Sequence, residues 1–198
     1  MPLGAFKAAL MGTAGVSTVE SAVVLLPDED YSGASEAVIN SGISTTYGEY
    51  IFKFYNINPS TDGAFFHFQA NATDSTSYDE SIVSTCFYAN HAEDNSGTPG
   101  FAYLTDHDQV GTAFQNIMTG IGSAANESTA GELHLFDPAS TTYAKHFYTC
   151  MNMTQGPAVK TSNMFFAGYI NTATAIDDIK FKMSAGNFDG TIKMWGVK

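Results

Sequence analysis

The sequence predicts an all-β protein, a two-sheet antiparallel sandwich of the jelly-roll type that follows a short N-terminal arm. Segments in which apolar and polar residues alternate recur along most of the chain, as in strands with one buried face. Glycine, proline, asparagine and aspartate separate these segments, without long helical patterns between them. The 198 residues, 44% of them hydrophobic, suffice for one such domain at residues 20–198, after an arm at residues 1–19.

The first half of the chain contains six expected strands, at residues 20–27, 35–42, 48–57, 64–72, 81–90 and 100–105. Pro27 and the acidic residues after it are expected to end the first strand. In the third strand, Tyr50, Phe52 and Phe54 share one face. The turn-forming residues 58–63 separate the third and fourth strands, which form either a long hairpin or a corner between two sheets.

The second half begins with an ambiguous segment, residues 110–122, whose apolar spacing fits a short helix while its glycines favour an irregular strand. Five strands follow, at residues 131–137, 143–153, 163–170, 175–184 and 190–197. The expected core-facing residues of the last two are Ile176, Ile179, Phe181, Met183, Ile192 and Met194. We expect these two strands to pair as a hairpin. Trp195 then lies on the outward face beside Lys180 and Lys182, as a partner contact or a cap on the rim of the sandwich.

Of these eleven strand-like segments we expect about eight to ten to form strands, a count that favours a two-sheet jelly roll. The charge of the chain excludes some classes of partner. With 20 acidic residues against 8 basic ones, the net charge is −12. Nucleic acids and anionic membrane surfaces repel such a chain, so neither is expected as a partner. No apolar run approaches the ~18 residues that a membrane-spanning helix needs.

Known catalytic motifs are missing from the sequence, which contains no nucleophile elbow, phosphate-binding loop or zinc-protease pattern. We therefore expect no enzymatic activity and no cofactor. Cys86 and Cys150 lie in strand-like runs without a second cysteine nearby. They are either two free thiols or one long-range disulfide.

Two short loops contain the residue types that bind metal ions. One holds Asp106, His107 and Asp108, and the other holds His91, Glu93 and Asp94. Adjacent side chains of an extended chain point in opposite directions, so a chelate needs a turn, and we expect solvated acidic loops instead. His67, His134 and His146 lie on strands, where exposed or hydrogen-bonded imidazoles are common.

Three segments of the domain carry recognisable motifs. Residues 47–72 contain a run of the type Y-x-F-x-F-x-N-I-x-P, residues 131–153 contain L-x-L-F-x-P-x-S-T-T-Y-x-K-H-F, and residues 165–198 close with G-T-I-K-M-x-G. Together they resemble a module of structural proteins of tailed bacteriophages, especially phages of aquatic bacteria. The start MPLGAF is also similar to the starts of many such virion proteins.

The resemblance implies a non-enzymatic structural role in a virion. Because few residues precede the module and none follow it, we expect it to stud a surface. The leading expectation is a capsid decoration (cement or knob) protein on the outside of a phage head. It would bind the major capsid protein or other virion proteins as a homo-oligomer, most simply a trimer. The acidic charge fits the exterior, because an inner face meets packaged DNA.

Two other functions remain open. The first is a tail fibre or receptor-binding tip that contacts host-surface glycans through loops such as 91–100 and 105–109. The second is a jelly-roll carbohydrate hydrolase, since a pair of carboxylates suffices for glycoside hydrolysis. The sequence contains many acidic residues in loops but does not single out such a pair.

The N-terminal arm is the other expected docking element. Its large apolar side chains are Leu3, Phe6, Leu10, Met11 and Val16, and they follow neither strand nor helical spacing for more than a turn. The arm is either a frayed terminus or edge strand, or a segment that orders when it fills grooves between neighbouring virion subunits.

Deletion of residues 1–17 tests the second of these interpretations. We expect the truncated protein to stay soluble and to unfold cooperatively, because the predicted strands all lie downstream, but no longer to incorporate into particles. Denaturant unfolding and sedimentation of the protein with virions measure the two properties. A truncated protein that decorates virions as well as the full chain, or that does not fold, would contradict the anchoring role.

Overall fold

The computed structural model describes residues 22–96, 98–155 and 160–198, and within these ranges every regular element is one of thirteen strands. None of the described residues belongs to a helix long and apolar enough to span a membrane. The predicted all-β sandwich is thus confirmed, with more strands than expected. The arm, residues 1–19, lies outside the described residues.

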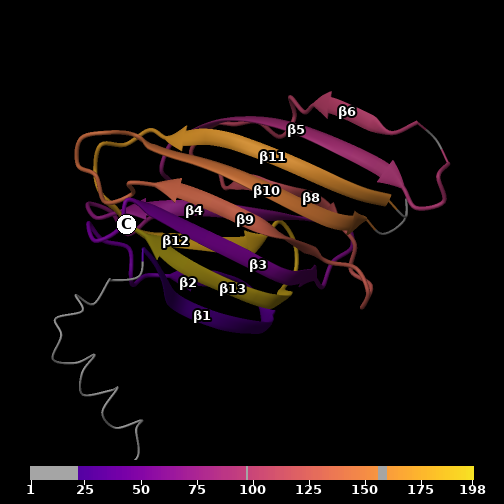
Figure 1. Cartoon of the computed structure of the whole chain (residues 1–198), viewed down its shortest axis with the longest axis horizontal. Helices are drawn as coiled ribbons and strands as arrows, with labels where there is room; N and C mark the ends of the chain where they lie inside the picture. The colour runs from indigo at the N-terminus through magenta and orange to yellow at the C-terminus, as the bar shows by residue number, and fades with distance from the viewer. Residues whose placement is uncertain (1–21, 97, 156–159) are drawn as a thin grey trace, which may run out of the picture.

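The strands form two antiparallel sheets, and Figure 1 shows the smaller one behind the larger. The nine-stranded sheet has the order β1 (Val23–Ala34), β13 (Phe188–Val197), β3 (Glu49–Pro59), β9 (Thr129–Phe136), β10 (Lys145–Gln155), β11 (Lys160–Ile170), β5 (Ile82–Ala92) and β6 (Gly100–Tyr103), and β7 (Val110–Gly111) also pairs with β5. The four-stranded sheet has the order β2 (Ala37–Ile39), β12 (Ile176–Met183), β4 (Ala64–Ala72) and β8 (Gln115–Ile121).

The first strand does not end at Pro27, as the sequence predicts, but continues to Ala34. Its pairing with β13 shifts register between Leu25 and Asp28, where Pro27 lies. Proline has no N–H to donate, and such an irregularity on an outermost strand tolerates it. The acidic residues that follow are held against β13, where Lys193 donates to Asp28 at 2.8 Å. Partners on β13 therefore keep the acidic segment extended.

The two ambiguous segments adopt one of their predicted alternatives. β3 and β4 belong to different sheets, so residues 58–63 form a corner rather than a hairpin turn. The segment 110–122 contains the strands β7 and β8 instead of a helix. β8 shifts register twice against β4, so it is the irregular strand that its glycines favour.

The predicted hairpin between the last two strands is wrong. β12 lies between β2 and β4 in the smaller sheet, whereas β13 lies between β1 and β3 in the larger one. The predicted core-facing residues are all buried, but Phe181 and Ile192 reach the core from opposite sheets. The loop between β12 and β13 therefore crosses the sandwich, and Trp195 has no place beside Lys180 and Lys182.

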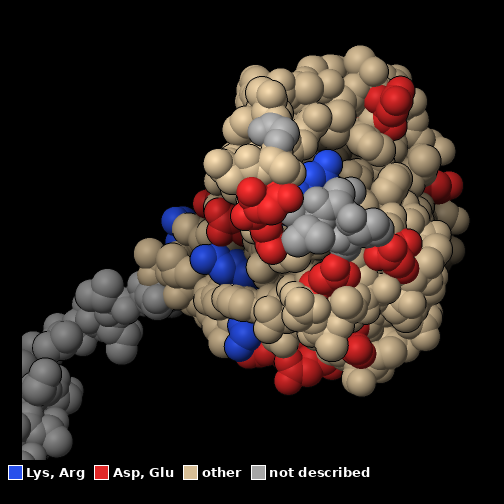
Figure 2. Space-filling view, turned by 90° about the vertical axis from the view of Figure 1, so that its right-hand side faces the viewer, with Lys and Arg blue, Asp and Glu red and all other residues tan. Residues whose placement is uncertain are grey.

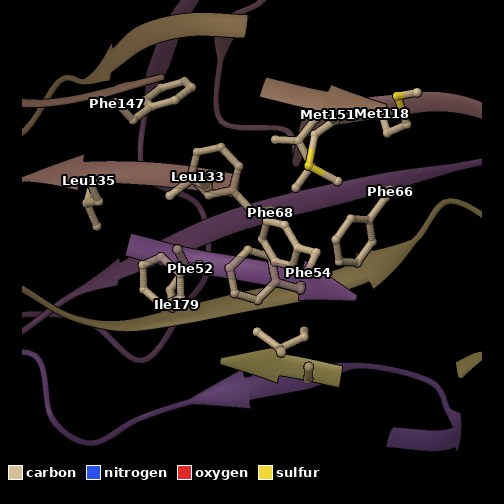
Figure 3. Packing of buried hydrophobic residues seen from close by; sticks show 14 of the residues in the cluster. Phe52, Phe54, Phe66, Phe68, Met118, Leu133, Leu135, Phe147, Met151 and Ile179 are labelled. Carbon is tan, nitrogen blue, oxygen red and sulfur yellow. The ribbon is translucent and has the colours of Figure 1, made fainter. Parts of the chain in front are cut away.

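The core consists of interlocking aromatic and aliphatic side chains from both sheets (Figure 3). The ring of Phe181 on β12 lies with its centroid 5.5 Å from Phe52 and 5.1 Å from Phe54 of β3. It also stacks on Phe66 of β4 at 5.9 Å. Tilted and edge-on rings at such distances add to the free energy of burying their area.

Two buried polar side chains bind carbonyl groups of loops. The fully buried Lys145 donates through Nζ to the carbonyls of Tyr143 and Thr172, at 2.9 and 3.0 Å. Gln69, also fully buried, donates through its amide to the carbonyls of Glu80, Thr112 and Ala113. Each side chain thereby satisfies loop carbonyls that the sheets do not pair.

Candidate functional site

The outward face of the larger sheet carries the candidate functional surface. Its side chains stand in rows because antiparallel pairing places residues of the same face opposite one another. One row crosses seven strands through Lys193, Lys53, Glu132, Cys150, Phe165, Phe87 and Tyr103. It changes from charged residues on β13, β3 and β9 to aromatic residues on β11, β5 and β6.

The aromatic end of this row forms an edge aromatic patch, defined by Phe87, Phe101, Tyr103 and Phe165. Phe87 stacks on Phe165 with the ring centroids 4.9 Å apart, and Phe101 lies 5.6 Å from Phe87. Phe101 is 75% exposed, Tyr103 52% and Phe87 39%. Large aromatic side chains grouped on a surface mark an interaction site more often than scattered ones.

The patch lies at the outermost strand of the sheet. β6 pairs only with β5 among the described strands, so one side of its backbone has no strand partner. None of these four aromatic residues is among the contact residues predicted from the sequence, although the alternation of β5 contains a signal. Because Cys86 points inward and is fully buried, its neighbour Phe87 must point outward.

The middle of the face holds a charged and aromatic network around His134. Its imidazole stacks on Tyr148 at 4.4 Å, and its Nδ1 is hydrogen-bonded to the carboxylate of Glu49. Its Nε2 lies 3.3 Å from Glu132, which also pairs with Lys53 at 3.6 Å. This predicted hydrogen-bonded histidine is therefore held between two carboxylates on the outward face.

A shallow hollow lies beside this network, with a volume of about 400 Å³. Polar side chains surround it, among them Lys53, Glu132, Asn152 and Asn163. Gly131 on its floor allows β9 and β10 to approach closely, because a Cβ there would collide with the carbonyl oxygen of Cys150. The hollow is open to solvent and belongs to the same face as the edge aromatic patch.

Trp195 lies on this outward face, opposite the buried side of β13, but on the second strand of the sheet rather than at an edge. It is partly covered, with Lys53 Nζ 5.9 Å from its ring centroid and Leu25 and Ile51 as its cross-strand neighbours. The predicted contact residues Leu3, Phe6, Leu10, Met11 and Val16 lie outside the described residues. A docking role for Trp195 stays a prediction.

The loop of Asp106, His107 and Asp108 does not gather its side chains into a chelate. Asp108 accepts a hydrogen bond from the hydroxyl of Tyr103, whereas His107 lies edge-on to Phe65 at 5.4 Å. No group of three metal-binding side chains occurs in the described part of the chain. His91, Glu93 and Asp94 are all exposed, and Asp94 accepts a hydrogen bond from the backbone of Ser96.

Both cysteines are free thiols, so the alternative of a disulfide is wrong. Cys86 is buried in the core, and this burial raises its thiol pKa to about 12. Cys150 is half-buried on the outward face, and burial raises its pKa as well. Neither thiol is present as the reactive thiolate at neutral pH.

Comparison with known proteins assigns the chain to no family: no protein-family model matches it, and no curated protein matches it either.

His67 provides a test of the electrostatics of the smaller sheet. Burial, assisted by the charge of its cross-strand neighbour Lys182, lowers its pKa from 6.5 to about 4. Between these values the unfolded chain binds a proton that the folded protein does not, so the unfolding free energy falls as pH falls from 6.5 to 4. We expect His67 to lower the unfolding free energy by about 1–3 kcal/mol over this pH range.

The measurement is urea unfolding of the wild type and of His67→Gln at pH 7 and pH 4.5. The variant should lose less stability on acidification than the wild type does. His146→Gln removes an exposed histidine from β10. This variant should lose as much unfolding free energy between pH 7 and pH 4.5 as the wild type does. An equal loss in wild type and His67→Gln would show that His67 titrates normally.

Proposed function

We propose that the chain is a non-enzymatic structural protein of a bacteriophage virion, a decoration protein on the outside of the head. The resemblance of residues 47–198 to virion modules suggests the context. The observation that carries the proposal is the edge aromatic patch, which combines exposed aromatic rings with an edge of β6 that pairs with no other described strand. Such a surface is suited to assembly rather than to catalysis.

We assign the edge aromatic patch to contacts between copies of this chain. A net charge of −12 opposes self-association over most of the surface. Figure 2 shows one side of the molecule, on which acidic residues outnumber basic ones. The four patch residues carry no charge, and the phenol of Tyr103 binds the nearby carboxylate of Asp108. The four patch residues therefore add no charge of their own to the repulsion between copies.

In this proposal the oligomer, a trimer in its simplest form, forms through the edge aromatic patch. The N-terminal arm and the other outward aromatics, including Trp195, contact the major capsid protein or other virion proteins. The second candidate is a tail fibre or receptor-binding tip that contacts host glycans. A pocket of about 280 Å³ favours this candidate, because it is lined by His107 from the loop 105–109, which is one of the loops expected to contact glycans.

Substitution of Phe101 tests the assembly surface. Phe101→Ser removes the most exposed ring of the patch without touching the core, so we expect a folded protein whose oligomer dissociates at concentrations where the wild type stays associated. Light scattering and sedimentation measure the mass. Tyr143→Ser, which removes an exposed ring from a loop outside the patch, should leave the mass unchanged. A wild type that is monomeric both at micromolar concentration and on particles would refute the assignment.

The copy number per particle tests the decoration role itself. A decoration protein is expected in many copies on the head, in a fixed ratio to the major capsid protein, whereas a fibre is expected in few copies at the tail. Quantitative mass spectrometry of purified virions, and of heads separated from tails, measures this ratio. Few copies that stay with the tails would favour the second candidate.

A further inference from the structure

A pocket of about 280 Å³ opens where the larger sheet extends past the smaller one. Side chains from β4, β5, β8, β10, β11 and the loop after β6 line it. Its size is close to the lower limit of roughly 300 Å³ for small-molecule sites, so it suits one compact ligand rather than a long chain.

The floor of the pocket is buried and mixed in character. The thioethers of Met153 and Met164 provide apolar surface. Ser162, which is also buried, adds a hydroxyl to the lining. In the described part of the chain, the side-chain hydrogen bond that reaches Ser162 ends on its backbone carbonyl rather than on this hydroxyl. A buried hydroxyl facing a pocket is a group that a polar ligand can satisfy.

The walls carry aromatic rings and hydrogen-bond donors. Phe65 and Tyr88 line the pocket with half-buried rings. Asn90 accepts from the backbone N–H of Gly100 at 3.1 Å, which leaves its amide N–H groups as donors. Aromatic faces beside amide and hydroxyl groups match the apolar C–H and polar O–H surfaces of a sugar ring.

The charge of the lining is opposite to that of the whole protein. Lys160 and His107 line the pocket, and no carboxylate is among its described lining residues. The ion pairs of lysines in the described part of the chain involve Lys53, Lys180 and Lys193 rather than Lys160. The ammonium group of Lys160 therefore has no carboxylate partner there and can bind a ligand anion.

His107 is oriented by its own contacts. Asn116 Nδ2 lies 3.4 Å from His107 Nδ1, and the imidazole stands at 89° to the ring of Phe65. An amide N–H that donates to Nδ1 leaves the proton of the neutral imidazole on Nε2. His107 is thus held as a second donor at this pocket.

We propose that this pocket binds one acidic monosaccharide unit, a hexuronate residue of a surface polysaccharide. Lys160 and His107 bind its carboxylate, Ser162 and Asn90 bind ring hydroxyls, and Phe65 and Tyr88 contact its C–H face. The proposal is independent of the decoration role, because the pocket is separate from the edge aromatic patch. Binding of a surface sugar is expected of a fibre tip and is compatible with a head decoration protein.

Two probes that differ only in the carboxylate test the proposal, methyl glucuronoside and methyl glucoside. Methionine-methyl NMR of the full chain is a local readout, because Met153 and Met164 line the pocket while other methionines report on the remaining core. We expect the glucuronoside to shift these two signals saturably. The glucoside should bind at least about tenfold more weakly. Acetate, which supplies the carboxylate alone, should bind more weakly than the glucuronoside.

Lys160→Gln should weaken glucuronoside binding about tenfold or more. Lys180→Gln, which removes a lysine of the smaller sheet that pairs with Glu36, should leave it unchanged. Unshifted Met153 and Met164 signals at millimolar glucuronoside, equal binding of the two sugars or of acetate, or unchanged binding by a folded Lys160→Gln would each overturn the proposal. These outcomes leave the oligomer mass and the virion copy number unaffected, so failure here is distinct from failure of the decoration role.

Discussion

Packing between a wide sheet and a narrow one shapes this protein. The inward rings of Phe52 and Phe54 meet Phe66 and Phe181 in the middle of the sandwich, where both sheets are present. The four-stranded sheet extends only to β8, which lies against β10 and β11. The strands β5 and β6 therefore extend past it, and their inward faces need another cover.

The loop between β6 and β7 lies along the edge of β5, and its residue Leu104 packs against the core. Leu104 donates its backbone N–H to the carbonyl of Cys86, and Ser84 exchanges hydrogen bonds with Gln109 through its backbone N–H and its hydroxyl. The same loop carries His107 to the edge of β8, where the cover is incomplete and the pocket remains. On the other side of the same strands, the edge aromatic patch lies beside the edge of β6 that no described strand pairs with. Pocket and patch thus have one structural origin, the overhang of the larger sheet.

Most lysines in the described part of the chain are paired with carboxylates, placed over an aromatic ring or buried. Lys53, Lys180 and Lys193 pair with carboxylates, Lys182 lies over the ring of Phe114, and Lys145 is buried against loop carbonyls. These positions neutralise or bury cations, so the exterior of the protein is dominated by acidic and uncharged polar groups. An acidic exterior disfavours contact with DNA, and the proposed self-association relies on uncharged aromatic surface instead.

The sequence by itself determined the fold class and the face of most residues, because a strand has a period of two and the alternation of Tyr50, Phe52 and Phe54, or of Ile179, Phe181 and Met183, records which side is buried. It did not determine the partner of a strand. β12 and β13 have matching inward faces and adjacent positions in the chain, yet they lie in opposite sheets. Likewise, Pro27 remains inside β1 because β13 holds the residues after it. Only the tertiary structure decided which strands overhang, and with them the pocket and the edge aromatic patch, because both depend on long-range pairing that the local pattern does not encode.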